Sequence, residues 1–382
     1  SALRDGDEAD DAPIEAAGLP GQSRFSTTTI GFTSGTDEGA KGVILSEQAL
    51  VRVAVRAFRE VGYRRRHAAT LHWLPLAHLF GRLGPLLDIV AGSTGSYGRG
   101  TEHLADDIAA ARPHALMAVP QFLDRARRAI EAHASARGSL RALAFRGGIA
   151  IGRCIAALPP RVRIPLQTQL RRSLFRTAHA RFGGRLELLI VGGAPVPLAD
   201  VAFFEAIGIP VRVGFGMTET AGVASIQPYR RRSKGCGLLL PGLEAQVGTD
   251  GNLLLRGDTL LSGYLGDIPR HPDAWFDTGD LAHIDADGSL HVLGRTKDVV
   301  IPLSGENINP TTLEHFLSEH PFVADACVFG DGRPAPAALL VLSAAGHGCA
   351  AESTDAVERA IADHVARVNA GLPKYARVAG FK

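Results

Sequence analysis

Lysine is scarce in this sequence, and the scarcity makes each lysine informative. Lysine and arginine together number 41 among 382 residues, but only five are lysine: Lys41, Lys234, Lys297, Lys374 and Lys382. This bias toward arginine is typical of codon usage rather than of function. The net charge is only +2, so no global positive field favours nucleic acid, and we expect no nucleic-acid partner.

Cysteine and long apolar runs are also lacking. The four cysteines, Cys154, Cys236, Cys327 and Cys349, are scattered without a C-x-x-C pair, which is typical of free thiols in a reducing compartment. No run of 18 apolar residues occurs, so no membrane-spanning helix is expected. We therefore expect a cytoplasmic protein, or one associated with the cytoplasmic face of a membrane.

Two familiar phosphate-binding motifs are absent, G-x-x-x-x-G-K-[ST] and G-x-G-x-x-G. The chain has instead "TIGFTSGTDEGAKGV" at 29–43, a β-prone run followed by a glycine-rich loop. Glycines allow backbone N–H groups to converge on an anion. The hydroxyls of Thr33, Ser34 and Thr36 and the ammonium of Lys41 could add to them. This pattern favours a phosphate-binding loop over its alternative, a Gly/Ser-rich surface turn.

Two later stretches complete a pattern. "GFGMTETAG" occupies 214–222 after a β-prone run, and "WFDTGDLAHIDADGSLHVLGRTKDVV" occupies 275–300. In this order and spacing, the three stretches resemble the adenylate-forming superfamily of acyl-CoA synthetases, luciferases and peptide-synthetase adenylation domains, over about residues 27–382. Within it, "WLPLAHLFGR", "VGGAPV", "SGYLGD" and "VFGDGRPAPAALLVL" are most similar to bacterial long-chain fatty acyl-CoA synthetases.

The resemblance implies a reaction in two halves. A carboxylate attacks the α-phosphorus of ATP, giving acyl-AMP and pyrophosphate, and coenzyme A then displaces AMP. Charge on the phosphates calls for donors, cations and a metal, so the implied ligands are a fatty acid, ATP, Mg²⁺ and coenzyme A. Two alternatives remain: an acyl-AMP ligase that loads an acyl carrier protein, and a non-catalytic remnant that binds nucleotide or acyl groups.

The resemblance also assigns nucleotide-binding residues. They fall on the phosphate loop, on the adenine pocket and its neighbouring turn, and at the ribose: Thr33, Ser34, Gly35, Thr36, Lys41, Gly192, Gly193, Ala194, Gly214, Phe215, Gly216, Asp280 and Arg295. Asp280 would accept both ribose hydroxyls. The residues themselves also allow plainer structures, a strand-to-helix turn at 192–195 and a strand, Asp-Gly turn and strand after Asp280.

Three residues are implied in the chemistry. Thr218 would hydrogen-bond the α-phosphate, and Glu219 would ligate Mg²⁺, a hard cation that prefers oxygen. The alternative for this pair is a helix start, with Thr218 at the N-cap and the acid in the first turn. His78 would stand near the reacting carboxylate and the acyl tunnel, although a lone histidine is more often structural.

Parts of the chain depart from the family pattern. Asp37 and Glu38 would lie next to bound triphosphate, and each exposed like-charge contact costs about 0.2–1 kcal/mol. No motif matches the family's catalytic lysine near the C-terminus, so Lys374 and Lys382 are not candidates. The polar segment before the phosphate loop is much shorter than in the family. We therefore expect a chain truncated at both ends that adenylates poorly or not at all.

The predicted fold is α/β with two domains. Residues 1–296 would form a large N-terminal AMP-binding domain, lacking its first part, with parallel α/β layers and a small β-barrel-like subdomain. A helix should run from an N-cap at Ser46 to about Val61. Residues 297–382 would form a small, incomplete α+β lid that rotates about a hinge at Lys297 between the two half-reactions.

Residues 125–185 are unusually basic, with fourteen arginines, no lysine and one acid, Glu131. Apolar residues interleave with the arginines. This pattern favours an arginine-rich, solvated helical insertion. The alternative is peripheral contact with an anionic membrane surface, where a long-chain acid would be delivered.

Overall fold

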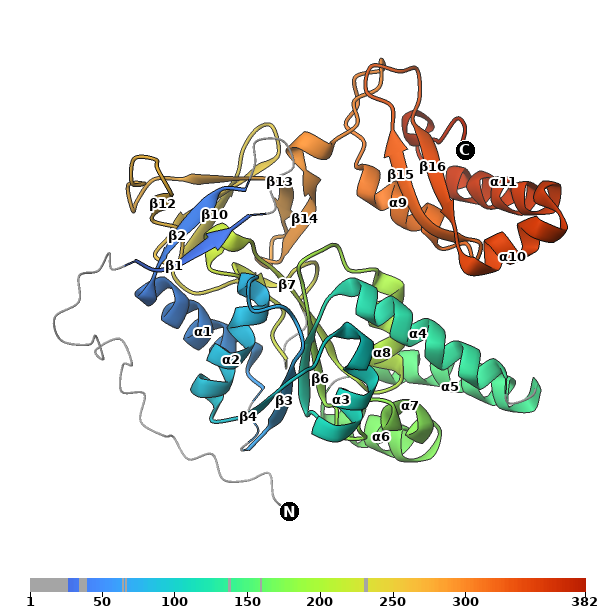
Figure 1. Cartoon of the computed structure of the whole chain (residues 1–382), viewed down its shortest axis with the longest axis horizontal. Coiled ribbons are helices and arrows are strands. Elements are labelled where there is room, and N and C mark those ends of the chain that lie inside the picture. The colour runs from blue at the N-terminus through green and yellow to red at the C-terminus, as the bar shows by residue number, and fades with distance from the viewer. Residues whose placement is uncertain are drawn as a thin grey trace.

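Figure 1 shows a computed structural model of the chain, with an α/β body and a smaller C-terminal domain in orange and red. The structure describes residues 27–33, 40–63, 65, 67–136, 139–158, 160–229 and 233–382. Among these residues, no helix combines the length and apolar character needed to cross a membrane. The four cysteines are free thiols, as predicted.

The body is built around a seven-stranded sheet. Five strands pair in parallel, and two short strands extend the sheet in antiparallel fashion. In spatial order they are β4 (Thr94–Tyr97), β3 (Ala69–His72), β5 (Ala115–Ala118), β6 (Leu188–Val191), β7 (Val211–Phe215), β8 (Ser225–Ile226) and β9 (Leu238–Leu239).

Helices cover both faces of the sheet. Leu188 and Ile190 of β6 pack in one apolar cluster with helices α1 and α2, whereas Leu189 and Val191 pack in another with α4 and α8. Successive side chains of a strand point to opposite faces, and a parallel sheet needs both faces covered. Figure 1 shows the resulting layers. On the first face lie α1 (Glu47–Val61) and α2 (Leu79–Ala91); on the second lie α3 (Leu104–Ala111), α4 (Pro120–Ser135), α5 (Ser139–Ala156), α6 (Pro160–Ser173), α7 (Arg176–Ala180) and α8 (Leu198–Ala206).

Helix α1 forms where the sequence predicts it. The Ser46 hydroxyl accepts a hydrogen bond from the Ala49 amide at 3.1 Å, which satisfies one of the free donors at the helix start. The helix ends at Gly62, whose φ of 62° is the left-handed conformation that glycine adopts without strain.

The arginine-rich region is helical, as predicted, and forms α4 to α7. At least one of its arginines forms ion pairs within the fold. Arg127 of α4 bonds to Asp124 and Glu131 on its own helix and to the buried Asp200 of α8. Contact of this region with a membrane stays a prediction.

Two smaller antiparallel sheets complete the body. One has four strands, β10 (Leu243–Val247), β11 (Asn252–Gly257), β13 (Phe276–Ile284) and β14 (Leu290–Arg295). The other has three strands, β1 (Thr27–Phe32), β2 (Gly42–Ser46) and β12 (Gly263–Tyr264). The short-strand region was predicted, but the pairing of β12 with β2 was not.

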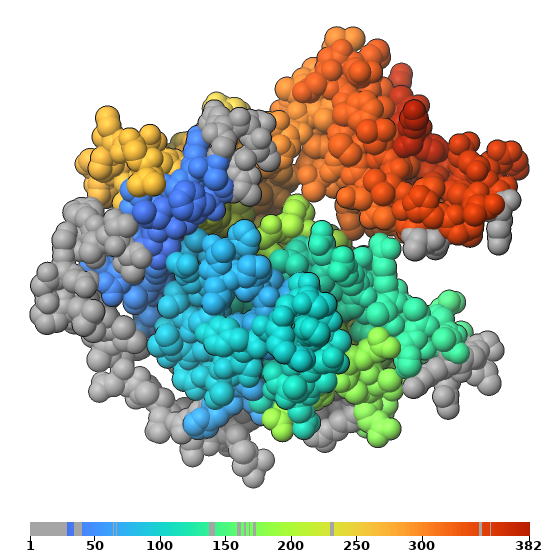
Figure 2. Space-filling view, viewed as in Figure 1, coloured from blue at the N-terminus to red at the C-terminus, as the bar shows by residue number. Residues whose placement is uncertain are grey.

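The C-terminal domain has its own core. Strands β15 (Val323–Phe329) and β16 (Ala337–Leu342) pack with α9 (Pro310–Ser318), α10 (Ala344–Glu352) and α11 (Thr354–Ala370). A 3₁₀ turn at Thr296–Asp298 joins it to β14. Figure 2 shows a hollow between this domain and the ends of α4 and α5. The predicted α/β class and its α+β C-terminal part are confirmed.

Candidate functional site

Two predicted glycine segments meet at the carboxyl edge of the parallel sheet. Gly192 follows β6, and Gly214 lies in its neighbour β7. A Cβ added at Gly192 would lie 3.1 Å from the Gly214 carbonyl oxygen and 3.6 Å from the ring of Phe80. Gly193 has a φ of +87°. The turn after β6 is therefore tight and presents bare backbone, and such crevices are where open α/β sheets bind ligands.

The turn after β7 shapes the next part of the site. A Cβ at Gly216 would lie 2.3 Å from the Gly222 carbonyl oxygen, so only glycine fits there. A single 3₁₀ turn, Thr218–Thr220, follows, and the Thr220 hydroxyl accepts from the Met217 amide at 3.0 Å. Met217 is thus the N-cap, and the alternative that placed Thr218 there as a helix cap is wrong.

Glu219 is buried, with 7% of its surface exposed. The Tyr264 hydroxyl donates to its Oε1 at 3.0 Å, and no other partner contacts this carboxylate among the described side chains. Burial and the negative charge of Glu219 both raise the pKa of Tyr264, so the phenol stays a donor. Lys41 Nζ lies 5.9 Å from the centroid of the same ring.

Tyr264 therefore joins the glycine-rich loop to Glu219, and the sequence analysis missed it. The signal was present, because "SGYLGD" carries a hydroxyl-bearing aromatic residue in one of the resembling motifs. The role became visible only through the pairing of β12 with β2.

The ends of the glycine-rich loop are held together. The Thr33 amide donates to the Lys41 carbonyl oxygen at 3.0 Å, and the Lys41 amide donates to Thr33 Oγ1 at 3.3 Å. A Cβ at Gly31, in the preceding strand, would lie 2.8 Å from Thr218 Cγ2, so β1 runs beside the turn after β7. Three predicted positions of this loop, Ser34, Gly35 and Thr36, and the two acids Asp37 and Glu38 lie outside the described residues.

Asp280 and Arg295 face each other across the β13–β14 hairpin, which forms as predicted. Arg295 Nε lies 2.9 Å from Asp280 Oδ1. The other oxygen, Oδ2, is buried without a hydrogen-bond partner among the described residues. Burial raises the pKa of Asp280 to about 6; Arg295 acts against the rise, and Glu219 adds to it. A buried, half-satisfied carboxylate is a ready acceptor for hydroxyl groups.

His78 is exposed at the N-cap of α2, and its side chain does not cap the helix. The next residue, Leu79, lies against two parts of the site: a Cβ at Gly222 would be 3.2 Å from its carbonyl oxygen, and a Cβ at Gly31 would be 2.8 Å from its Cδ2. His78 thus stands at the edge of the region where β1, α2 and the Thr218 turn converge. Phe80, two residues on, packs toward Gly192 and was also missed.

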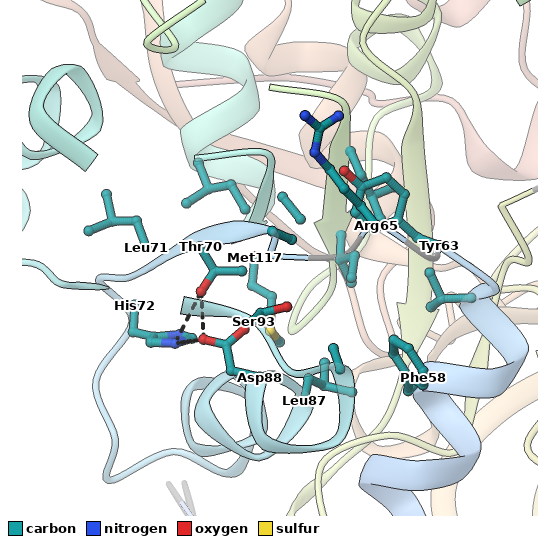
Figure 3. Close-up of a pocket in the computed structure, with 18 residues that line it drawn as sticks. Phe58, Tyr63, Arg65, Thr70, Leu71, His72, Leu87, Asp88, Ser93 and Met117 are labelled. Carbon is teal, nitrogen blue, oxygen red and sulfur yellow. Dashed lines mark hydrogen bonds and ion pairs between the residues drawn. The ribbon is translucent and has the colours of Figure 1, made fainter. Parts of the chain in front are cut away.

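A pocket of about 70 Å³ lies between α1, α2 and the sheet. Figure 3 shows apolar walls that include Phe58, Leu87 and Met117. Polar side chains also line the pocket, and three of them are linked: Asp88 Oδ2 accepts from the Thr70 hydroxyl at 2.6 Å and lies 2.7 Å from His72 Nε2. Both side chains of the His72–Asp88 pair are largely buried.

Comparison with known protein families identifies the architecture. The family described as AMP-binding enzyme matches residues 5–265, and the AMP-binding enzyme C-terminal domain matches residues 297–380. The chain belongs to the AMP-binding enzyme family. This agrees with the resemblance drawn from the motifs.

Two curated members of the AMP-binding family serve as named comparisons. The chain is 29% identical over 324 residues to long-chain-fatty-acid–CoA ligase FadD15 of Mycobacterium bovis, covering 82% of this chain and 54% of that protein. It is 30% identical over 365 residues to putative fatty-acid–CoA ligase fadD11 of Mycobacterium tuberculosis, covering 90% and 64%. The chain therefore spans between about half and two thirds of the length of these relatives.

Solved AMP-binding enzymes share the fold. O-succinylbenzoate coenzyme A synthetase (MenE) from Bacillus subtilis, in complex with AMP, aligns with a TM-score of 0.66 at 22% identity, over 94% of this chain and 66% of that one. The anthranilate CoA ligase AuaEII in complex with anthranoyl-AMP aligns with a TM-score of 0.67 at 20% identity, over 94% and 64%. At this identity the likeness establishes the fold.

Proposed function

We propose that this chain carries the site of an ATP-dependent ligase that activates a fatty acid as acyl-AMP and passes the acyl group to coenzyme A. One observation carries the proposal: Thr218, Glu219, Lys41 and the open carboxylate of Asp280 come from segments far apart in sequence and gather around the turn after β7. The names of the fatty-acid–CoA ligase relatives support the substrate class.

The nucleotide would lie along this edge. The backbone at Gly192 and Gly193, followed by the small Ala194, would leave room for a flat adenine ring beside Gly214 and Phe215. Oδ2 of Asp280 has no partner among the described residues, so it would accept a ribose hydroxyl, while Arg295 holds Oδ1 and contacts the sugar. The hydroxyls of Thr33 and Thr218 and the Lys41 ammonium would face the phosphates.

Glu219 fits the role of a Mg²⁺ ligand. Its Oε1 is fixed by Tyr264, and carboxylate oxygen is the donor that Mg²⁺ prefers. Bound there, Mg²⁺ would neutralise charge on the triphosphate. The contribution of the chain is to hold that carboxylate in one orientation, beside the Thr218 hydroxyl.

The acyl chain would enter the pocket beside α2. Gly84 and Leu87 of this helix line the pocket, and the same helix begins beside His78, where the reacting carboxylate would lie. The pocket of about 70 Å³ is smaller than an engineered cavity of about 150 Å³ that holds benzene. A long acyl chain must therefore widen it, by moving α2 away from the sheet or by shifting side chains.

The domain boundary near residue 297 and the hinge at Lys297 belong to the same proposal. Lys297 is exposed in the 3₁₀ turn between β14 and the C-terminal domain, and rotation there would bring a second face of that domain to the acyl-adenylate. An assay with coenzyme A and with a phosphopantetheinyl carrier protein, each after loading with acyl-adenylate, decides the acceptor. Sedimentation with anionic vesicles tests membrane contact through 125–185.

The first test is thermal stability of this chain with non-hydrolysable acyl-adenylates carrying acetyl, octanoyl, palmitoyl or benzoyl groups. A ligand at 100 times its Kd stabilises the folded state by about 2.7 kcal/mol. We expect the shift to grow from acetyl to palmitoyl and to disappear in Asp280→Ala. If none of the four adenylates changes the melting temperature, the nucleotide site is absent from this chain, and the proposal fails for it.

A further inference from the structure

The outer end of the β13–β14 hairpin carries a group of side chains that the ligase function does not use. His283 lies near the end of β13, Asp285 follows it, and His291 lies on β14. One imidazole nitrogen from each histidine and one oxygen of the aspartate all lie within 4.8 Å of one another. Among the described residues these form a compact set with the donor types of a transition-metal site.

The backbone explains why the three side chains meet. His283 and His291 are directly paired across the two strands, and Asp285 is two residues after His283, so all three project from one face. The imidazole rings lie 4.9 Å apart between centroids. His283 Nε2 is 2.9 Å from Asp285 Oδ1, and His291 Nε2 is 3.0 Å from Oδ2.

Gly235 lies close to the ring of His291. A Cβ at Gly235 would lie 2.9 Å from both Cγ and Nδ1 of the His291 ring, and 2.3 Å from the Leu290 carbonyl oxygen. Gly235 has a φ of +51°, and the absence of a side chain there leaves space for the ring. A side chain at residue 235 would displace the His291 ring, so the glycine preserves the space that the ring occupies beside Asp285.

We propose that His283, Asp285 and His291 form a binding site for Zn²⁺ or a similar divalent transition-metal ion. Two imidazoles and one carboxylate suit Zn²⁺, which is bound tetrahedrally at about 2.0–2.2 Å, whereas Mg²⁺ and Ca²⁺ prefer oxygen alone. Those bond lengths place neighbouring ligand atoms roughly 3.4 Å apart. The two nitrogens need only approach each other modestly, and the fourth position stays open to water.

Lys234 would compete with a metal ion for the carboxylate of Asp285. Its Nζ lies 3.9 Å from Asp285 Oδ2, and its side chain is 75% exposed. The ammonium offers the aspartate a mobile positive charge, which a metal ion would displace into solvent. Removal of this lysine should therefore strengthen metal binding, an effect that a purely structural hydrogen-bond cluster would not show.

A bound ion would link β13 to β14 across the His283–His291 pair. The same two strands hold Asp280 opposite Arg295 at their other end. Metal binding would thus stabilise the hairpin on which the proposed ribose carboxylate sits, without touching the nucleotide. The site stands independently of the proposed ligase function, because it is assayed with metal alone.

The test is calorimetric titration of ZnCl₂ into the untagged chain, previously treated with EDTA, with the melting temperature measured in parallel. We expect one ion per chain and a rise in melting temperature. His291→Ala should weaken binding at least tenfold, and Lys234→Ala should tighten it several-fold. His103→Ala, which removes an exposed histidine beside α3, should bind like the parent chain.

Hydrogen exchange separates a lost ligand from a lost fold. His291→Ala should keep the native circular dichroism spectrum and should lose the Zn²⁺-dependent protection of amides in β13 and β14. The proposal is overturned if the parent chain takes up no Zn²⁺ in the calorimetric titration, or if His291→Ala binds as tightly as the parent. Either result would mean that the His283–Asp285–His291 cluster only links the two strands through hydrogen bonds and binds no metal.

Discussion

The two ends of the β13–β14 hairpin each hold an aspartate, and the two carboxylates are treated differently. At the inner end, Asp280 is 4% exposed, with one oxygen on Arg295 and the other without a partner among the described residues. At the outer end, Asp285 has both oxygens on imidazoles and a lysine nearby. The carboxylate of Asp280 is buried with one oxygen unpaired, whereas the carboxylate of Asp285 is more exposed and has a nitrogen partner at both oxygens.

The contrast between the two carboxylates indicates which kind of ligand each could bind favourably. Burying an unpaired carboxylate costs free energy in the ligand-free protein, and a ligand that supplies the missing donor recovers it. A carboxylate already satisfied gains little from a hydroxyl, and only a stronger cation can displace its partners. The inner end is thus suited to a sugar hydroxyl, and the outer end to a metal ion.

The largest expected effect concerns the ligand-free protein and pH. Burial raises the pKa of Asp280 from 3.8 to about 6, so its stabilising contribution is complete below pH 3.8 and is lost as the pH rises through about 6. The ionised group then destabilises the fold by on the order of 2–3 kcal/mol. Asp280→Asn should therefore melt several degrees higher than the parent at pH 8 and at nearly the same temperature at pH 4. A lower melting temperature for Asp280→Asn at pH 8 would show that the ion pair with Arg295 outweighs burial.

The next effect is on ligand binding. Asp280→Ala should weaken acyl-adenylate binding by about 1–3 kcal/mol, because a charge-assisted hydrogen-bond acceptor is lost. Calorimetry with an octanoyl-adenylate analogue measures it. Asp277→Asn is the matched control, since Asp277 is an exposed acid on the same strand and should bind normally. Unchanged affinity in Asp280→Ala would remove Asp280 from the site.

Tyr264→Phe should have an intermediate effect. It removes the hydroxyl that donates to buried Glu219 and leaves a carboxylate oxygen without that donor, at a cost of about 1–2 kcal/mol. We expect a lower melting temperature and weaker binding of Mg²⁺-ATP, with AMP affinity less affected. Equal losses for ATP and AMP would mean that Tyr264 supports the fold rather than the Mg²⁺ ligand.

The smallest effect is expected at the outer end. Asp285→Asn should change stability by less than about 1 kcal/mol, the range of surface ion pairs, and should leave acyl-adenylate affinity unchanged. Thermal melts and the same calorimetry check both. If Asp285→Asn weakened adenylate binding as strongly as Asp280→Ala, the two ends of the hairpin would be coupled, and the contrast between them would be lost.

Much of the secondary structure could be predicted from short stretches of the sequence. The Ser46 cap, the Asp-Gly hairpin and the alternation of strand and helix each depend on a few adjacent residues, and each was predicted. The fold class followed from them together with the motif order. What could not be predicted depends on long-range contacts: Tyr264 meeting Glu219, Phe80 meeting Gly192, and His72 meeting Asp88.

The site residues show the same division. Asp280 and Arg295 could be expected to be close because a short hairpin joins them. The missing partner of Asp280 Oδ2 could not be foreseen, since it depends on every side chain that packs around it. The His283–Asp285–His291 group has no helical or loop motif spacing, and its register across the strands was needed to bring it together.

The contact of Lys41 with Tyr264 also has a consequence for folding during synthesis. More than two hundred residues separate them, and chains are synthesised at about 5–20 residues per second. The glycine-rich loop would therefore wait roughly 10–45 s on the ribosome before β12 arrives to pair with β2. During that interval one edge of β2 has no strand beside it. Until residue 264 emerges, the unpaired N–H and C=O groups on that edge of β2 are open to pairing with another chain. We therefore expect a chaperone or another bound protein to cover this edge during synthesis.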